Sequence, residues 1–482
     1  MVDVVIIGCG IVGADVAYEL SKYRFTTVVL ERENDIATGT TKANSAIIHA
    51  GFDPKPGTLM AKLNVEGAQL TKELCSKLDI PYEQIGSLVL AFSREELITL
   101  EKLYEQGVQN GVPDLRLLDE GDLHLFEPNV SQNAIGALCA PTAAIVNPWE
   151  YAIALAETAV NNGVELHLNS GVTAIEKKSD YYLIETTSGV YETKYIINAA
   201  GVYADQIHNL IGQPAFKTIP NRGQYYLLDK AEGSRVSRVI FQCPTAEGKG
   251  VLISPTVHGN LIVGPNSENI VANEDVSVTS EGLSFIAEMA KKSVPSIRLN
   301  ESIRNFAGIR ALADVEDFII GESATAKNFI NLAGIKSPGL SAAPAIAKMT
   351  VGILSDLGSK LVAKSSVVDS RKKIRFKELS SEAKNELITK NSAYGHIVCR
   401  CELITEGEIL DALHGPIPAS TIDGVKRRCN AGMGRCQGGF CSPRVVETIR
   451  HELNIRPEDI LQDKSGTYII SGESKGEGAA RV

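Results

Sequence analysis

The fold is decided by residues 2–31, which read VDVVIIGCGIVGADVAYELSKYRFTTVVLE. The β-branched apolar run at 2–7 predicts a buried strand, and residues 14–21 have the apolar spacing of a helix. A second apolar run at 27–30 predicts another buried strand. The chain therefore opens with a strand, a helix and a second strand, the unit from which parallel sheets are built.

A glycine-rich turn joins the first strand to the helix. Gly8, Gly10 and Gly13 form the pattern G-x-G-x-x-G, and Glu31 ends the second strand. In a dinucleotide site the first glycine allows a tight turn, the second lets the backbone approach the pyrophosphate, and the third lets the helix pack closely. The acidic residue accepts a ribose hydroxyl. Because all these parts stand in register, we expect a dinucleotide site and not a plain glycine-rich turn.

Composition restricts the classes of protein that this chain can represent. Its 482 residues are 44% hydrophobic and 22% charged, which is typical of a globular chain of two or three domains. The net charge of -10 disfavours binding to nucleic acid or to an acidic membrane surface. The N-terminus has no basic segment before its apolar run, and no stretch is apolar enough to span a bilayer. We expect a cytoplasmic protein.

The nine cysteines are unevenly distributed, with five of them between 399 and 441. A disulfide framework is disfavoured in a long cytosolic chain, so this group indicates metal ligands. Cys399 and Cys401 are followed by 34 intervening residues, then by Cys436 and Cys441. Four thiolates are the number that a [2Fe-2S] cluster needs, and the alternative, zinc, usually takes C-x-x-C pairs. Cys429 is the extra cysteine, which we expect not to be a ligand.

Three further segments carry a resemblance to a known family. They are residues 38–51, beginning TGTTKANS and ending HAG, residues 198–201, NAAG, and residues 334–340, GIKSPGL. With the glycine pattern they resemble the D-amino-acid-oxidase-like FAD-dependent oxidoreductases over residues 2 to about 355. The resemblance implies bound FAD, oxidation of a carbon-hydrogen bond, and a helix whose electropositive N-terminus faces the flavin ring. The cofactor-binding residues it implies, besides the fingerprint, are Thr40, Thr41, Asn44, Ser45, Ala200, Gly201, Gly339 and Leu340.

The sequence around the clustered cysteines resembles a second family. Residues 398–402, VCRCE, and 432–441, GMGRCQGGFC, are similar to the bacterioferritin-associated-ferredoxin-like [2Fe-2S] domain. Loop glycines would turn backbone amides toward sulfur, and four arginines would offset the charge of the cluster, namely Arg400, Arg427, Arg428 and Arg435. The whole arrangement resembles the large subunits of anaerobic glycerol-3-phosphate dehydrogenases. The first domain alone is also similar to L-2-hydroxyglutarate dehydrogenases, at 44–51 and 56–58.

The fold class expected is α/β, a Rossmann-like FAD-binding domain with an inserted, mainly antiparallel α+β substrate domain and a small C-terminal iron-sulfur domain. Strands predicted near 224–228 and 261–263 indicate the insertion. The boundaries we expect are the following: flavin part at about 1–80, 145–215 and 305–362; substrate part at about 81–144 and 216–304; connector at 363–393; [2Fe-2S] domain at 394–455; and tail at 456–482. The last eleven residues, glycine-rich and charged, are expected to be mobile.

Four residues are candidates for catalysis. Arg310 stands where related flavoenzymes hold a substrate anion, and its alternative is a surface ion pair. Lys336 is expected beside the ring, in contact with substrate or flavin. Arg222 precedes a strand of the insertion, and either points into the pocket or serves the structure. His49 is the first candidate for a base, with packing as the alternative, and His258 is a weaker one.

We expect a dehydrogenase in which a small anionic metabolite reduces FAD and electrons pass through the [2Fe-2S] centre to a partner. The preferred substrate is glycerol 3-phosphate, which would give dihydroxyacetone phosphate. The alternatives are L-2-hydroxyglutarate or another 2-hydroxy acid, an amino acid or an amine such as proline, and an electron-transfer subunit without its own substrate. The partner expected is a second flavoprotein or an iron-sulfur, quinone-linked subunit, which would hold the protein at the membrane surface.

Overall fold

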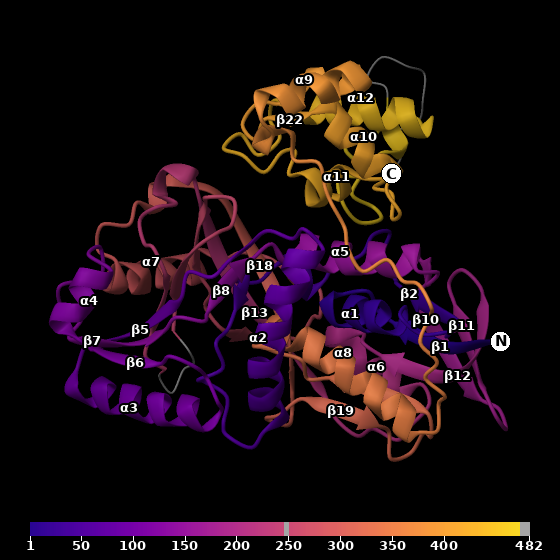
Figure 1. Cartoon of the computed structure of the whole chain (residues 1–482), viewed down its shortest axis with the longest axis horizontal. Helices are drawn as coiled ribbons and strands as arrows, with labels where there is room; N and C mark the ends of the chain where they lie inside the picture. Colours follow the sequence, from indigo (N-terminus) through magenta and orange to yellow (C-terminus); the bar gives the residue numbers. More distant parts are fainter. Residues whose placement is uncertain (245–249, 473–482) are drawn as a thin grey trace.

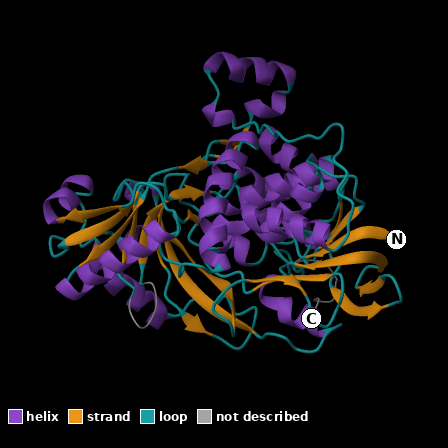
Figure 2. Cartoon of the chain, turned by 60° about the horizontal axis from the view of Figure 1, so that its bottom comes forward, coloured by secondary structure: helices purple, strands orange, loops and turns teal. Residues whose placement is uncertain are grey.

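The computed structural model describes residues 1–244 and 250–472. Two sheets with their helices form the body of the molecule, and a small, mostly helical C-terminal domain lies above them in Figure 1. Figure 2 shows the strands of the two sheets on either side of a central group of helices. The predicted fold class is confirmed, whereas residues 473–482 of the predicted mobile end lie outside the described residues.

The first sheet contains the predicted strand, helix and strand. Strand β1 (Val2–Ile7) pairs in parallel with β2 (Thr27–Leu30), and α1 (Ile11–Leu20) connects them. Val4 and Ile6 pack on the helices of one face, and alternate residues of β1 pack on the other face. Both faces are buried, which is why these strands are apolar runs without alternation. The other strands are β9 (Glu165–His167), β10 (Val172–Lys177), β11 (Tyr182–Thr186), β12 (Val190–Asn198), β19 (Ile319–Glu322) and β20 (Phe329–Ala333).

Four more helices belong to this part of the body. Their bounds are α2 (Leu59–Lys77), α5 (Pro148–Asn161), α6 (Ala204–Asn209) and α8 (Gly339–Asp356). Helices α1, α5 and α8 share one apolar core with β1. A small sheet of β3 (Ile47–Ile48), β4 (Tyr82–Glu83) and β8 (Ala144–Val146) adjoins them.

The second sheet is mostly antiparallel, as expected for the inserted domain. Its strands are β5 (Ser87–Ala91), β6 (Arg116–Asp119), β7 (Gly136–Ala140), β13 (Thr218–Leu228), β14 (Val239–Gln242), β15 (Leu252–Pro255), β16 (Leu261–Gly264), β17 (Glu268–Asn269) and β18 (Ser302–Ala313). Helices α3 (Arg94–Gln109), α4 (Glu120–Phe126) and α7 (Ser280–Ser293) belong to the same part. The predicted boundary at about 305 differs from the observed one, because β18 pairs along its length with β13.

The C-terminal domain is built around its own apolar core. Its elements are α9 (Ser381–Lys390), β21 (Ile397–Cys399), β22 (Ile404–Thr405), α10 (Glu406–His414), α11 (Ile422–Cys429) and α12 (Ser442–Leu453). The short 3-10 helices of the chain are η1 (Thr40–Lys42), η2 (Gly201–Tyr203), η3 (Lys230–Glu232), η4 (Leu299–Glu301), η5 (Phe376–Glu378), η6 (Ser392–Gly395) and η7 (Pro457–Asp459).

Residues 456–472 differ from the expected tail. Leu461 forms a bridge with Tyr468, and Asp463 pairs with Lys42 of the body, Oδ2 to Nζ 2.5 Å. Polar contacts hold this segment together with Ile460, which is fully buried in the core of the C-terminal domain. None of the helices in the described ranges has the length and apolar character needed to span a membrane.

Candidate functional site

A cavity of about 1050 Å³ is lined by both sheets and by the C-terminal domain, and the glycine-rich turn forms part of its wall. Gly8 and Gly10 line the cavity. A Cβ atom on Gly13 would lie 2.0 Å from the carbonyl oxygen of Gly8, so only glycine lets α1 pack this closely on the end of β1. The exposed N-terminus of α1 therefore faces the cavity as a phosphate site, with room for a dinucleotide.

Glu31 also lines the cavity, at the end of β2. Its carboxylate accepts hydrogen bonds from the backbone N–H of Cys9 (2.8 Å) and of Glu33 (3.0 Å). Burial raises the pKa of Glu31, and these two bonds act in the opposite direction. The bonds orient a carboxylate that retains acceptor capacity, which fits the role of holding ribose hydroxyls.

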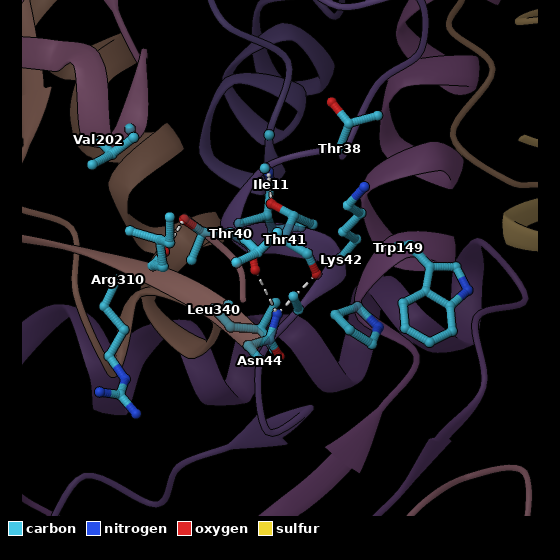
Figure 3. A pocket seen from close by; sticks show the side chains of 18 of the residues that line it. Ile11, Thr38, Thr40, Thr41, Lys42, Asn44, Trp149, Val202, Arg310 and Leu340 are labelled. Atoms are coloured by element: carbon cyan, nitrogen blue, oxygen red, sulfur yellow. Dashed lines mark hydrogen bonds between the residues drawn. The ribbon is translucent and has the colours of Figure 1, made fainter. Parts of the chain in front are cut away.

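The loop at 38–45 follows the cavity, and its own hydrogen bonds shape it (Figure 3). The Asn44 side-chain amide donates to the carbonyls of Thr40 (3.2 Å) and Thr41 (2.8 Å). Thr41 Oγ1 accepts from the backbone N–H of Ile11 (2.9 Å), which ties the loop to the start of α1. Ser45 Oγ lies 3.4 Å from the hydroxyl of Tyr225 on the second sheet. The four predicted loop residues thus line one continuous wall.

The other predicted cofactor residues meet at the same cavity. Ala200 and Gly201 line it after β12, and Gly339 and Leu340 line it at the first turn of α8. No side chain among the described residues caps the N-terminus of this 18-residue helix, and the Gly339 N–H donates to the Lys336 carbonyl (2.7 Å). Partial positive charge at this end suits an anionic group.

His49 and Lys336 both line the cavity from segments 287 positions apart. The His49 backbone N–H donates to Ser341 Oγ (2.7 Å), and His49 Nε2 lies 3.4 Å from Ser337 Oγ. The imidazole stacks on Phe241 with ring centroids 5.7 Å apart. The turn after β3 and the residues that precede α8 therefore both position His49, which lies next to Lys336.

Arg310 points from β18 toward the cavity and is held by neutral partners (Figure 3). Its guanidinium donates to the side-chain oxygen of Asn221 and to the carbonyl of Asn266, the latter at 3.2 Å. Neither partner neutralises the charge, so the cavity wall carries a fixed cation that can bind an anion.

Arg222 is the one predicted catalytic residue that the structure does not bring to the cavity lining. Its guanidinium pairs with Glu268 and with Asp275, each at 2.8 Å, and donates to Ser277 Oγ at 2.5 Å. The side chain is 5% exposed. Two carboxylates already balance this cation, so Arg222 serves the structure, which was the alternative to a place in the pocket.

Several lining residues carried no sequence signal strong enough to be predicted. Tyr225 stacks on Phe306 with centroids 4.7 Å apart, and both line the cavity. Trp149 lines it from the start of α5, away from Arg310 in Figure 3. His258, the weaker candidate for a base in the sequence, lines it as well, 3.0 Å from the Asn147 side-chain amide. Burial lowers the pKa of His258 to about 4, so this ring is neutral near pH 7.

The four predicted cysteine ligands form two pairs. Cys401 and Cys436 have their Sγ atoms 3.7 Å apart, and the thiols of Cys399 and Cys441 are hydrogen-bonded to each other. No group of three or more His, Cys, Asp or Glu side chains in the described ranges is spaced to hold one metal ion. Two pairs of thiols suit a cluster of two irons, each with two cysteine ligands.

Backbone amides converge on these sulfurs, as the glycine-rich loop predicted. The N–H groups of Gly438 and Phe440 point to Cys436, and that of Gly432 points to Cys399. A hydrogen bond from Cys441 lowers the pKa of Cys399 to about 6. The pKa of Cys436 is also lowered, whereas the pKa values of the partner thiols Cys401 and Cys441 are raised, so one thiol of each pair favours the thiolate, the form that binds iron.

Cys429 lies apart from the two pairs. Its thiol donates to the carbonyl of Val425 (3.3 Å), and burial raises its pKa to about 12. Cys429 is therefore not a member of the two pairs of thiols that fit the cluster.

The arginines expected to offset the cluster's charge serve other contacts. Arg427 and Arg428 both pair with Asp35 of the body, each at 2.8 Å. Arg435 pairs with Glu301 at 3.2 Å, and Arg400 stacks on Phe440 at 4.5 Å. These ion pairs join the C-terminal domain to the body.

Two family models match the chain. Residues 3–353 match the FAD dependent oxidoreductase family, and residues 397–451 match the BFD-like [2Fe-2S] binding domain. The cofactors predicted from the sequence, FAD and a [2Fe-2S] cluster, are thereby confirmed, and the cavity and the paired thiols fit them.

Individual relatives agree with these matches. A glycerol 3-phosphate dehydrogenase of Caloramator mitchellensis is 52% identical over 99% of this chain and 100% of its own. The human mitochondrial L-2-hydroxyglutarate dehydrogenase is 30% identical over 72% of this chain and 87% of its own. A solved structure of L-alpha-glycerophosphate oxidase from Mycoplasma pneumoniae with FAD bound is 33% identical, with a TM-score of 0.74, covering 77% of this chain and 99% of that one.

Proposed function

Because the chain belongs to the FAD dependent oxidoreductase family, we propose that it is a dehydrogenase that oxidises glycerol 3-phosphate to dihydroxyacetone phosphate. The observation that carries the proposal is Arg310, a cation in the cavity wall with neutral partners, which suits an anionic substrate. The relative that this chain matches end to end is a glycerol 3-phosphate dehydrogenase, which supports the choice of anion. FAD, when bound, accepts the two electrons of the alcohol carbon, and the [2Fe-2S] cluster carries electrons singly.

Residues of the cavity wall bind the substrate, take its proton and stabilise negative charge. Arg310 and Lys336 bind the phosphate, whose two negative charges require more than one cation. His49 takes the proton of the hydroxyl group, since its ring lies in the same wall and Ser337 orients it. The uncapped start of α8 stabilises negative charge at its end of the cavity.

The electrons leave through the cluster to a partner protein, either a second flavoprotein or an iron-sulfur, quinone-linked subunit. We place the reaction in the cytoplasm, at the membrane surface when the partner is bound there. All nine cysteines are free thiols, which suits a reducing compartment.

The rival substrates place different demands on the cavity. L-2-hydroxyglutarate carries a carboxylate at each end and needs cations at both ends, and its dehydrogenases match only the flavin part of this chain. Proline or another amino acid also carries a cationic or neutral amine, which Arg310 and Lys336 would not favour. A subunit without its own substrate has no need for cations in its cavity.

Anaerobic mixing of the oxidised protein with glycerol 3-phosphate tests the proposal. The flavin absorbance should bleach with this substrate and not with L-2-hydroxyglutarate or L-proline. Arg310→Ala should slow that reduction by about 1.5–3 kcal/mol, roughly tenfold to a hundredfold, because a charge-assisted hydrogen bond is lost.

Arg310→Lys is the matched control, since it keeps the charge and loses the guanidinium fork. It should fall between the wild type and Arg310→Ala. Bleaching by L-2-hydroxyglutarate alone, or an unchanged rate in Arg310→Ala, would contradict the substrate or the role of Arg310, respectively.

A further inference from the structure

The C-terminal domain contributes to the wall of the flavin cavity. Lys426, Arg427, Asn430, Met433 and Gln437 line it from this domain, together with Glu402. Figure 1 shows α11, which carries Lys426 and Arg427, on the side of the domain that faces α5. The cavity is therefore completed by residues more than 40 positions beyond the end of the flavin-family match.

A buried ion cluster anchors the domain on the first sheet's side of the cavity. The Asp35 carboxylate, 4% exposed, accepts hydrogen bonds from Arg427 and from Arg428. Arg427 also pairs with Asp463, which in turn pairs with Lys42. Burial opposes ionisation of Asp35, yet the two guanidinium groups hold its pKa below the ordinary value.

A second anchor joins the domain to the inserted part of the body. Glu402, whose side chain is 3% exposed, pairs with Lys230 (2.8 Å). Arg435 pairs with Glu301 at the start of β18 (3.2 Å). The domain is thus tied to both halves of the cavity, and Ile417 adds an apolar contact by packing into the core of α1, α5 and α8.

The cluster ligands lie directly behind the wall that the domain provides. Glu402 and Gln437 line the cavity. Each of them directly follows a cysteine ligand, Cys401 and Cys436 respectively. The same docking that adds this part of the cavity wall therefore brings one pair of cysteine ligands next to it.

We propose that the docked C-terminal domain shields the flavin cavity from O₂, that Asp35 is the residue that positions it, and that release of the domain turns the chain into an oxidase. This proposal rests on the proposed function for the electron source. In the released state one alcohol and one O₂ give one ketone and one H₂O₂, since two electrons and two protons pass to O₂. A closed site suppresses such side reactions, and proximity favours the cluster as the electron acceptor.

Among the relatives named for glycerol phosphate, the comparison supports this division of labour, whereas an L-2-hydroxyglutarate dehydrogenase matches 72% of the chain, a share similar to that of the oxidase. The glycerophosphate oxidase is covered over 99% of its length by 77% of this chain, a share near that of the flavin-family match. The relative that matches the whole chain is a dehydrogenase.

Asp35→Asn in the full chain tests the proposal, because it keeps the shape and removes the charge that pairs both arginines. Loss of one partner of a buried pair should shift the equilibrium between docked and released states by about a hundredfold. Lys230→Gln weakens the second anchor at a more exposed position, and Arg450→Gln removes an exposed pair inside α12 as the matched control. FAD and iron contents identify the variants that are folded.

Two measurements are compared with the wild type. Limited proteolysis should cut the segment between α8 and α9 faster in Asp35→Asn and Lys230→Gln, which reports release. After anaerobic reduction by dithionite, mixing with O₂ should reoxidise the flavin and form H₂O₂ severalfold faster in the same two variants and not in Arg450→Gln.

Released variants with unchanged reoxidation by O₂ would overturn the shielding role. Unchanged proteolysis in folded Asp35→Asn would overturn its role as anchor. Because dithionite supplies the electrons, both results hold whether or not glycerol 3-phosphate is the substrate, whose failure the anaerobic bleaching experiment reports separately.

Discussion

Arg310 and Arg222 show how strand register decides what an arginine can do. Arg310 pairs with Asn221 across β18 and β13, so the two side chains share the face that meets the cavity. Arg222 is the next residue along β13 and points to the opposite face, where Glu268 and Asp275 neutralise it. The sequence did not show which face of the sheet each arginine occupies, because the register between distant strands is set by tertiary pairing.

His258 predicts a pH dependence of stability. The ring lies among Glu150, Lys230, Lys373 and Lys377, and burial, as the largest cause, lowers its pKa to about 4. In the unfolded chain a histidine titrates near pH 6.5, at about its ordinary value. Between these pH values the unfolded state binds the proton and the folded state does not, so stability falls as the pH falls from about 6.5 to 4.

The His258→Gln variant measures that contribution. Glutamine keeps a hydrogen-bond acceptor for the Asn147 amide and does not titrate. The free energies of unfolding of wild type and variant, measured with urea at several pH values, should converge as the pH falls. The variant should lose less stability over this range. Equal slopes for both proteins would show that folding does not shift the pKa of His258.

At the scale of elements, the packing of α2 on α8 depends on one glycine. A Cβ on Gly67 would lie 2.2 Å from the backbone oxygen of Ser341, so the helices approach closely only there. Ser341 Oγ also accepts the His49 backbone N–H (2.7 Å). The helix contact is thereby connected to the histidine of the site.

Gly67→Ala should therefore affect both stability and chemistry. Overpacking should cost about 1–3 kcal/mol in the free energy of unfolding, and the shift of Ser341 should slow anaerobic flavin reduction. Gly352→Ala, in α8 with nothing within 4 Å of the added Cβ, is the control and should be neutral or stabilising. A Gly67→Ala chain as stable and as active as the control would mean that the helices separate without cost.

Short local patterns gave the two strands that open the chain, since the strands predicted at 2–7 and 27–30 are confirmed residue by residue. The cofactor loop was predicted from a family resemblance, and the cysteine ligands from their number and spacing together with a second resemblance. Tyr225, Trp149 and the cavity residues of α11 could not, since they reach the site through packing of remote segments. Tyr225 and Trp149 look like ordinary core residues in a sequence, and the charged residues of α11 look like a solvated helix face.

At the scale of the whole molecule, ion pairs join segments that lie far apart in the sequence. The connector is fastened to α5 by Arg371, Lys373 and Arg375, which surround Glu150. In the sequence these cations belong to the connector expected at 363–393. Their partners are more than 200 positions away, and an isolated run of charges does not reveal them.

The division into two cofactor-bearing parts leads to the last prediction. Cys436 is an exposed member of one thiol pair, and the residues that fit FAD belong to the body, apart from the C-terminal part of the cavity wall. Cys436→Ser should remove iron and sulfide while FAD stays bound, because the thiolate is lost without disturbing either core. The purified wild-type chain should hold about two irons and two sulfides per FAD.

Cys429→Ser provides the matched control in the same domain. Its thiol donates only to the Val425 carbonyl in its own helix, a bond that serine can replace, so iron and sulfide should stay at the wild-type level. Metal analysis and the visible spectrum distinguish the variants. Iron loss in Cys429→Ser would make that residue a ligand, and stoichiometric zinc in the wild type would contradict the cluster. A variant that retains its flavin should then still be reduced by substrate, and it should lose electron delivery to the proposed partner, because the proposed path runs through the cluster.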